Sequence, residues 1–158
     1  MMDKDRKLSR YERVYAQLAG LLVKTPDTQA HMATVAALLY HKFDYFFWCG
    51  FYRLAGGDLV VGPYQGPLAC QVLARNKGVC WEAIRRGAAV VVPDVREFPG
   101  HIACDPRSLS EIAVPVRDEK GAVVAVLDAD SDKPAQFDVV DARQLERIAG
   151  LLFQAPAS

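Results

Sequence analysis

The residues best able to do chemistry gather in one short segment, Pro99 to Ile112. It holds His101, Cys104, Asp105 and Glu111, and its prolines and glycine predict a loop. Apolar runs that favour strands flank the segment on both sides. Reactive side chains on a loop between rigid elements are where function tends to sit. Cys104 is therefore the starting point for a functional interpretation.

Three of the four cysteines lie in or beside predicted loops, namely Cys70, Cys80 and Cys104. From the residues alone, each is as consistent with a buried thiol as with a reactive one. Cys80 is slightly favoured as the reactive thiol, because the first turn of a helix lowers a thiol pKa. Cys49 lies inside an aromatic strand-like run and is expected to be a small buried residue. Together, three loop-associated thiols favour thiol redox chemistry.

A metal site is the rival use of the same residues. His101 and Cys104 have an H-x-x-C spacing, and Cys70 or Cys80 could complete a tetrahedral zinc shell. No C-x-x-C or H-x-x-x-H pair accompanies them. We therefore expect no metal ligands among these residues.

Carboxylates and aromatics suggest a second cluster. Asp128 and Asp130 end an apolar strand-like run, and residues two apart on a strand point to one side, about 7 Å apart. Either the strand simply ends in solvent, or the two aspartates and Glu111 form a pocket that holds a cationic group or supplies a proton. Trp48 and Tyr52, four apart on a strand, are either core or one aromatic wall of a small-ligand pocket.

The overall composition excludes several function classes. Hydrophobic residues make up 51% and charged residues 24%, and 19 basic residues balance 19 acidic ones, so nothing directs the protein to nucleic acid or an anionic membrane. No apolar run approaches the roughly 20 residues of a membrane span, and the first residues lack the apolar core of a signal peptide. We expect a cytoplasmic protein, where cysteines are more often catalytic, redox-active or buried than structural disulfides.

Hydrophobic spacing and turn residues predict the elements that must position these side chains. The region Gly62 to Lys77 is expected to be mostly loop, with a short strand near residues 71–73. His31 and His41 are placed on the polar face of the second helix. Asp138 is expected to cap the last helix, with Asp141 in its first turn. Helices are expected at about residues 8–23, 27–41, 79–87 and 138–153, and strands at about 45–54, 59–61, 88–92, 112–116 and 122–130.

Neighbouring strands joined by short turns predict an α+β fold, with a central antiparallel sheet and helices packed on it. At 158 residues the chain suits a single domain with a proper core. Its expected parts are N-terminal helices (about 8–41), the sheet with the active-site loops (about 45–130) and a C-terminal helix (about 138–153).

Five segments of the chain resemble the free methionine-(R)-sulfoxide reductases, which are stand-alone GAF-domain enzymes. The resemblance runs from about Tyr11 to Leu152, with the segments in the same order, and implies the GAF fold. The GHIACD…SEI motif and the three-cysteine pattern are much more specific than a generic GAF likeness. The segments are FFWCGFYRL (46–54), VGPYQGPLAC (61–70), KGVC (77–80), DVREFPGHIACDPRSLSEIAVPV (94–116) and VLDADSD (126–132).

The resemblance assigns roles to the cysteines and reverses the preference for Cys80. Cys104 matches the family's catalytic cysteine, and Cys70 matches the resolving cysteine that forms a disulfide with it. Cys80 matches an auxiliary or alternative resolving cysteine. Cys49 departs from the family, whose members commonly carry an aliphatic residue there, and would place an additional thiol near the pocket.

The resemblance also assigns the substrate pocket. Glu111, Asp128 and Asp130 match the acidic residues that bind the substrate's ammonium and sulfoxide groups. Trp48 and Tyr52 match the aromatic side that receives the methyl sulfoxide end.

The implied function is reduction of free L-methionine-(R)-sulfoxide to L-methionine through a cysteine sulfenic acid and an intramolecular disulfide. The disulfide would be reopened by a thioredoxin-type donor, with no bound cofactor. The family often forms homodimers, and the N-terminal helices are the candidate contact. The alternative is a non-catalytic GAF module that binds a small ligand or senses peroxide.

Overall fold

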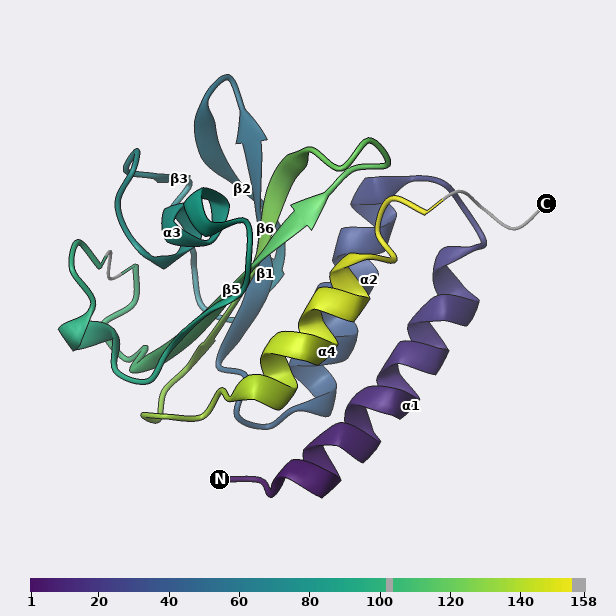
Figure 1. Ribbon diagram of the computed structural model, residues 1–158, viewed down its shortest axis with the longest axis horizontal. Coiled ribbons are helices and arrows are strands. Elements are labelled where there is room, and N and C mark those ends of the chain that lie inside the picture. The colour runs from purple at the N-terminus through teal and green to yellow at the C-terminus, as the bar shows by residue number, and fades with distance from the viewer. Residues whose placement is uncertain (102–103, 155–158) are drawn as a thin grey trace.

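The computed structural model describes residues 1–101 and 104–154; Ile102 and Ala103 of the GHIACD motif and the last four residues of the expected domain lie outside the described residues. The elements follow each other in the order helix, helix, hairpin, short strand, helix, strand, hairpin, helix (Figure 1). The helices are α1 (Lys4–Leu22), α2 (Thr28–Lys42), α3 (Val79–Arg86) and α4 (Val139–Ala149), with a 3-10 turn at Val95–Glu97. The strands are β1 (Trp48–Ala55), β2 (Asp58–Gln65), β3 (Val72–Leu73), β4 (Val90–Val92), β5 (Ser110–Arg117) and β6 (Val123–Ser131).

One antiparallel sheet organises the molecule, with strand order β3-β2-β1-β6-β5-β4. Figure 1 shows α2 and α4 against one face of the sheet, α1 packed outside them, and α3 on the opposite face. The expected α+β class with a central antiparallel sheet is confirmed. Because β1 and β6 are neighbours, segments about 80 positions apart in the chain share the middle of the sheet.

Strict alternation along β1 decides which side chains meet which layer. Cys49 and Phe51 are fully buried in the core between the sheet and α1, α2 and α4. Trp48 and Tyr52 belong to a second apolar cluster on the α3 side, as their four-residue spacing predicted. The sheet therefore has a structural face and a face available for a site.

The loop expected from Gly62 onwards begins later, because β2 continues to Gln65. Tyr64 pairs with Gly50 and Val61 with Tyr52, so two residues of β2 oppose one residue of β1. Such a bulge leaves residues outside the regular ladder, which accommodates Pro63 and its missing N–H. Pro63 was expected to lie in a loop, and in the structure it lies in a bulge within β2.

Helix boundaries follow their capping residues. Gly87 ends α3 in a left-handed conformation (φ 63°), as expected for a C-terminal glycine. The Asp138 side chain caps α4. In return, the side chain of Asp141, the third residue of the helix, accepts the backbone N–H of Asp138, which completes a capping box. Helix α1 starts at Lys4, earlier than the apolar spacing predicted, because the Asp3 carboxylate accepts two backbone N–H groups there.

A buried ionic cluster holds α1 to the rest of the fold. Lys7 is fully buried, and its ammonium donates to Asp141 at 2.7 Å and to Asp138 at 3.3 Å. The other Asp141 oxygen accepts from the hydroxyls of Tyr11 (2.7 Å) and Tyr45 (2.6 Å). Asp141 was expected only to favour the helix dipole, and it instead joins three elements.

The expectation that His31 lies on a polar face is wrong. His31 is buried, with ring nitrogens 2.9 Å from the Leu152 carbonyl and 2.6 Å from the Thr25 carbonyl. Leu152 lies beyond the end of α4 at Ala149, so the histidine ties the segment after that helix to α2. His41 is exposed, as predicted. No helix within the described residues combines the length and apolar content that crossing a membrane requires.

Candidate active site

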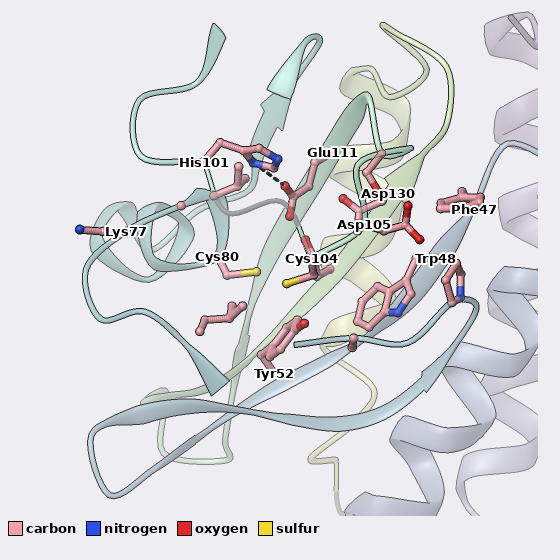
Figure 2. A pocket seen from close by; sticks show the side chains of 17 residues that line it. Phe47, Trp48, Tyr52, Lys77, Cys80, His101, Cys104, Asp105, Glu111 and Asp130 are labelled. Atoms are coloured by element: carbon pink, nitrogen blue, oxygen red, sulfur yellow. Dashed lines mark ion pairs between the residues drawn. The ribbon is translucent and has the colours of Figure 1, made fainter. Parts of the chain in front are cut away.

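A pocket lies between the second face of the sheet, α3 and the loops that precede β3 and β5. About 590 Å³ of empty space lies among its lining residues when the open, solvent-filled mouth is included. Figure 2 shows side chains from these elements pointing toward one another. The lining residues are Phe47, Trp48, Tyr52, Pro67, Ala69, Leu73, Lys77, Gly78, Val79, Cys80, His101, Cys104, Asp105, Ser108, Glu111, Asp128 and Asp130.

Strand register brings the predicted polar residues together. Trp48 pairs with Asp130, and Asp130 pairs with Glu111, so one row of the sheet presents an indole and two carboxyl groups. Asp128 shares their face two residues along β6, opposite Gly50. Glu111 was expected on a loop, but β5 begins at Ser110, and a strand fixes its position more firmly than a loop would.

The aromatic wall depends on a glycine. The Trp48 ring stacks near Tyr52 (centroids 5.8 Å, 22°) and Tyr64 (5.3 Å, 21°). A Cβ on Gly50 would lie 2.8 Å from the end of the Trp48 ring, and it would also clash with Tyr64. Only glycine lets the indole lie across the strand in this way. The buried Trp48 N–H has no partner among the described residues.

Cys70 and Cys104 form a disulfide, with Cα atoms 5.5 Å apart. The two residues are 34 positions apart, and the bond joins the loop before β3 to the loop before β5. Cys104 is exposed and Cys70 is half-buried, so this pair lies at the mouth of the pocket. Beside it, Arg107 pairs with Asp105 at 2.7 Å, and this hydrogen-bonded ion pair lowers the Asp105 pKa to about 2.

Cys80 lies in the first turn of α3, as predicted, but the expected acidic thiol is wrong. The residue is buried, and burial raises the pKa of its thiol well above the usual range. The nearby carboxyl groups of Asp128 and Glu111 raise that pKa further. Desolvation and negative neighbours outweigh the helix dipole, so the environment of Cys80 favours the neutral thiol.

The three carboxyl groups perturb one another. Burial raises the pKa of Glu111 well above its usual range, and the charges of Asp128 and Asp130 add to this. Burial also raises the pKa of Asp128, which hydrogen bonds from Glu111 and Cys80 partly offset. The pKa of Asp130 is raised for the same reasons, burial first. Burial and the neighbouring negative charges therefore favour the protonated form of Glu111.

His101 stands beside this acidic group. Its Nδ1 atom is 3.9 Å from a Glu111 oxygen, and burial lowers the pKa of the imidazole (Figure 2). At this distance the two groups are not hydrogen-bonded, so proton exchange between them would need a small side-chain movement.

One expectation about the cysteines is not met. Cys49 was expected near the pocket, yet alternation along β1 turns it to the opposite face of the sheet, where burial raises its pKa. Cys70 and Cys104, which the rival zinc interpretation would use with His101, are bonded to each other.

Sequence reasoning gave no role to Ser110. It is fully buried, donates to the Lys133 carbonyl at 2.6 Å and accepts from the Gln136 N–H at 3.4 Å. These bonds fix the start of β5 directly before Glu111. Phe47, which carries Arg107 over its ring at 4.9 Å, was also missed as a pocket residue. The only sequence signal for either was adjacency to a predicted site residue.

Comparison with known proteins agrees with this geometry. Residues 26–155 match the family model described as the GAF domain. The chain is 41% identical to GAF domain-containing protein A of Dictyostelium discoideum, with 96% of this chain and 95% of that protein covered. It is 39% identical to the free methionine-R-sulfoxide reductase of Escherichia coli, over 92% and 88%. The crystal structure of free methionine-R-sulfoxide reductase from Neisseria meningitidis, in complex with its substrate, superposes with a TM-score of 0.88 at 41% identity, covering 96% of this chain and 89% of that one.

Proposed function

The chain belongs to the GAF-domain family and, within it, to the free methionine-R-sulfoxide reductases, and from this premise we propose that it reduces free L-methionine-(R)-sulfoxide to L-methionine. The observation that carries the proposal is the position of Cys104 at the mouth of a pocket whose floor holds the carboxyl group of Glu111, with a pKa raised by burial. A sulfoxide bound there would have a thiol on one side and an acid on the other.

In the first step, the Cys104 thiolate attacks the sulfoxide sulfur and Glu111 delivers a proton to the sulfoxide oxygen. The oxygen leaves the substrate as a hydroxyl group on the cysteine sulfur. Methionine sulfoxide is thereby reduced by two electrons to methionine, and Cys104 is oxidised to a sulfenic acid. The raised pKa of Glu111 supports this assignment, since an acid must hold its proton at working pH.

In the second step, the Cys70 thiol condenses with the Cys104 sulfenic acid and releases water. The disulfide between these two residues supports this order, because it is the product that such a step would leave. Cys80 is the auxiliary or alternative resolving cysteine, and it would have to lose its buried contact with Asp128 to reach a partner.

Substrate recognition is assigned to the pocket floor and its aromatic wall. Asp128 and Asp130 pair with the α-ammonium group, whose positive charge would favour their ionised forms over the protonated forms that burial favours in the empty pocket. Trp48 and Tyr52 receive the methyl sulfoxide end. A methionine sulfoxide within a peptide lacks the ammonium charge and should bind poorly.

A thioredoxin-type donor is assigned the recycling step, through thiol–disulfide exchange. The exposure of Cys104 supports this, because the incoming thiolate must reach a disulfide sulfur from solvent. No bound cofactor enters the proposed cycle.

The test is NADPH oxidation coupled through thioredoxin reductase and thioredoxin, with the (R) and (S) epimers of free methionine sulfoxide and an N-acetylated (R) substrate. We expect turnover with the free (R) epimer alone. Absence of turnover with either free epimer, with dithiothreitol also tried as donor, would favour a GAF module that binds a small ligand or senses peroxide.

A further inference from the structure

One cluster in the pocket floor has the composition of a metal site. The Cys80 sulfur and one carboxylate oxygen each from Glu111 and Asp128 all lie within 4.8 Å of one another, and all three side chains are buried. They come from α3, β5 and β6, so three separate elements bring their donor atoms together.

A second observation shows that this cluster lacks a partner. The Oδ1 atom of Asp128 is buried without a hydrogen-bond partner among the described residues, in a side chain only 3% exposed. Leaving a buried carboxylate oxygen unpaired is unfavourable, and a bound cation is a common resolution.

The pocket itself supplies little positive charge. Of the described residues that line it, only Lys77 and His101 can be cationic. Figure 2 shows the Lys77 ammonium pointing away from the cluster, and burial lowers the pKa of His101. Three acidic groups and a thiol therefore face one another with no fixed counter-charge.

We propose that Cys80, Glu111 and Asp128 form a zinc(II) site that closes the substrate pocket when substrate is absent. A thiolate with two carboxylates is a donor set suited to zinc and poorly suited to Mg²⁺ or Ca²⁺, which prefer oxygen alone. In a tetrahedral zinc shell the donor atoms lie about 3.5 Å apart, so side-chain shifts of about 1 Å close the cluster on an ion.

Three protein ligands leave the fourth position open to water on the pocket side. Zinc binds thiolate and carboxylate ligands in their deprotonated forms, so affinity should rise with pH. An ammonium group and a zinc ion cannot occupy the same carboxylates together. The resulting competition with methionine sulfoxide is the one part that rests on the proposed function.

The test uses the protein with its Cys70–Cys104 disulfide intact, which leaves Cys49 and Cys80 as the only thiols. Co²⁺ serves as the probe, because a cobalt–thiolate bond gives a near-ultraviolet charge-transfer band, and Zn²⁺ is then titrated to displace it. We expect one site per chain and full loss of the band on Zn²⁺ addition.

The two free cysteines provide matched variants, since both are buried but only Cys80 faces the cluster. Cys80→Ala should abolish the band and weaken zinc binding at least about tenfold, while Cys49→Ala should retain both. Asp128→Asn, nearly isosteric, should weaken binding in the same way if Cys80→Ala fails to fold. A band that survives Cys80→Ala, or the absence of any site in the parent protein, would overturn the proposal.

Competition is measured without turnover, as zinc released by free methionine sulfoxide into a chromophoric chelator. Zinc binding in a protein that fails to reduce sulfoxide would refute the proposed function and leave the metal site standing. Turnover in a protein that does not bind zinc would refute the metal site and leave the proposed function standing.

Discussion

Glu111 of β5 and Asp130 of β6 lie directly opposite each other in the antiparallel sheet. Like charges in that relationship are unfavourable, and burial increases the penalty. The raised pKa of Glu111 favours its protonated form, which lessens this repulsion. This pair of opposed carboxyl groups, which is unfavourable for the stability of the fold, thus places an acid and a cation-binding group in one pocket.

Replacing the proposed nucleophile should end catalysis. Cys104→Ser should lower kcat by at least about 10³-fold, because a neutral hydroxyl is a far weaker nucleophile than a thiolate. The coupled NADPH assay measures this. Cys49→Ala, on the other face of the sheet, is the matched control and should stay near the parent rate. Full activity in Cys104→Ser would remove this cysteine from the mechanism.

Replacing the proposed resolving cysteine should separate the two chemical steps. Cys70→Ser should form about one methionine per chain in a single turnover without reductant, because attack at Cys104 needs no second thiol. Thioredoxin-driven steady-state turnover should then stall. Quenched-flow measurement of methionine shows both phases. Normal steady-state turnover in this variant would instead identify Cys80 as the main resolver.

The pH profile should identify the acid. Glu111 is active when protonated, and its pKa is raised, so kcat should fall as pH rises through that raised value. Glu111→Gln should lower kcat by about 10²-fold or more and lose this alkaline limb. Glu119→Gln, in the exposed turn between β5 and β6, is the control. An unchanged alkaline limb in Glu111→Gln would assign the proton to another carboxyl group.

The acidic cluster should make stability depend on pH. Asp128 has a raised pKa in the folded protein, so the folded state binds its proton more tightly than the unfolded state does. Stability is therefore greatest below the unfolded carboxyl pKa and falls as pH rises through the folded value. Asp128→Asn removes this loss and should stabilise the protein at pH 8 by about 1 kcal/mol, with little gain at pH 4. Urea unfolding of the parent and the variant at both pH values measures the change in the free energy of unfolding. An equal change at pH 4 and pH 8 would show that titration of Asp128 is not its cause.

The buried cluster around Lys7 should carry much of the attachment of α1. Asp141→Asn leaves the Lys7 charge poorly paired and should lower the free energy of unfolding by about 3 kcal/mol. Tyr11→Phe removes one hydrogen bond to the same carboxylate and should lower it by about 1 kcal/mol. Asp58→Asn breaks an exposed pair with Arg75 and should have no measurable effect. Equal losses in all three variants would show that burial does not govern these contacts.

The local features of the protein follow from short-range patterns in its sequence. Spacing placed Trp48 and Tyr52 on one side of β1, and Asp128 and Asp130 near the end of one strand. Glycine and aspartate caps located the ends of α3 and the start of α4. These features depend on residues within a few positions of each other, so short-range geometry decides them. The pairing of Cys70 with Cys104 came from family resemblance, since reasoning from the residues left the cysteine roles open.

Which residues lie side by side across the sheet follows from the pairing of strands that are distant in the chain. The pairing of β5 with β6 and of β6 with β1 places Glu111, Asp130 and Trp48 in one row, and no local pattern contains that register. The packing of α3 over this row reverses the expected acidity of Cys80, because desolvation and negative neighbours exceed the helix dipole. The burial of His31 and Lys7 has the same cause. Burial and charge depend on contacts between residues far apart in the chain, and the fold alone brings those residues together.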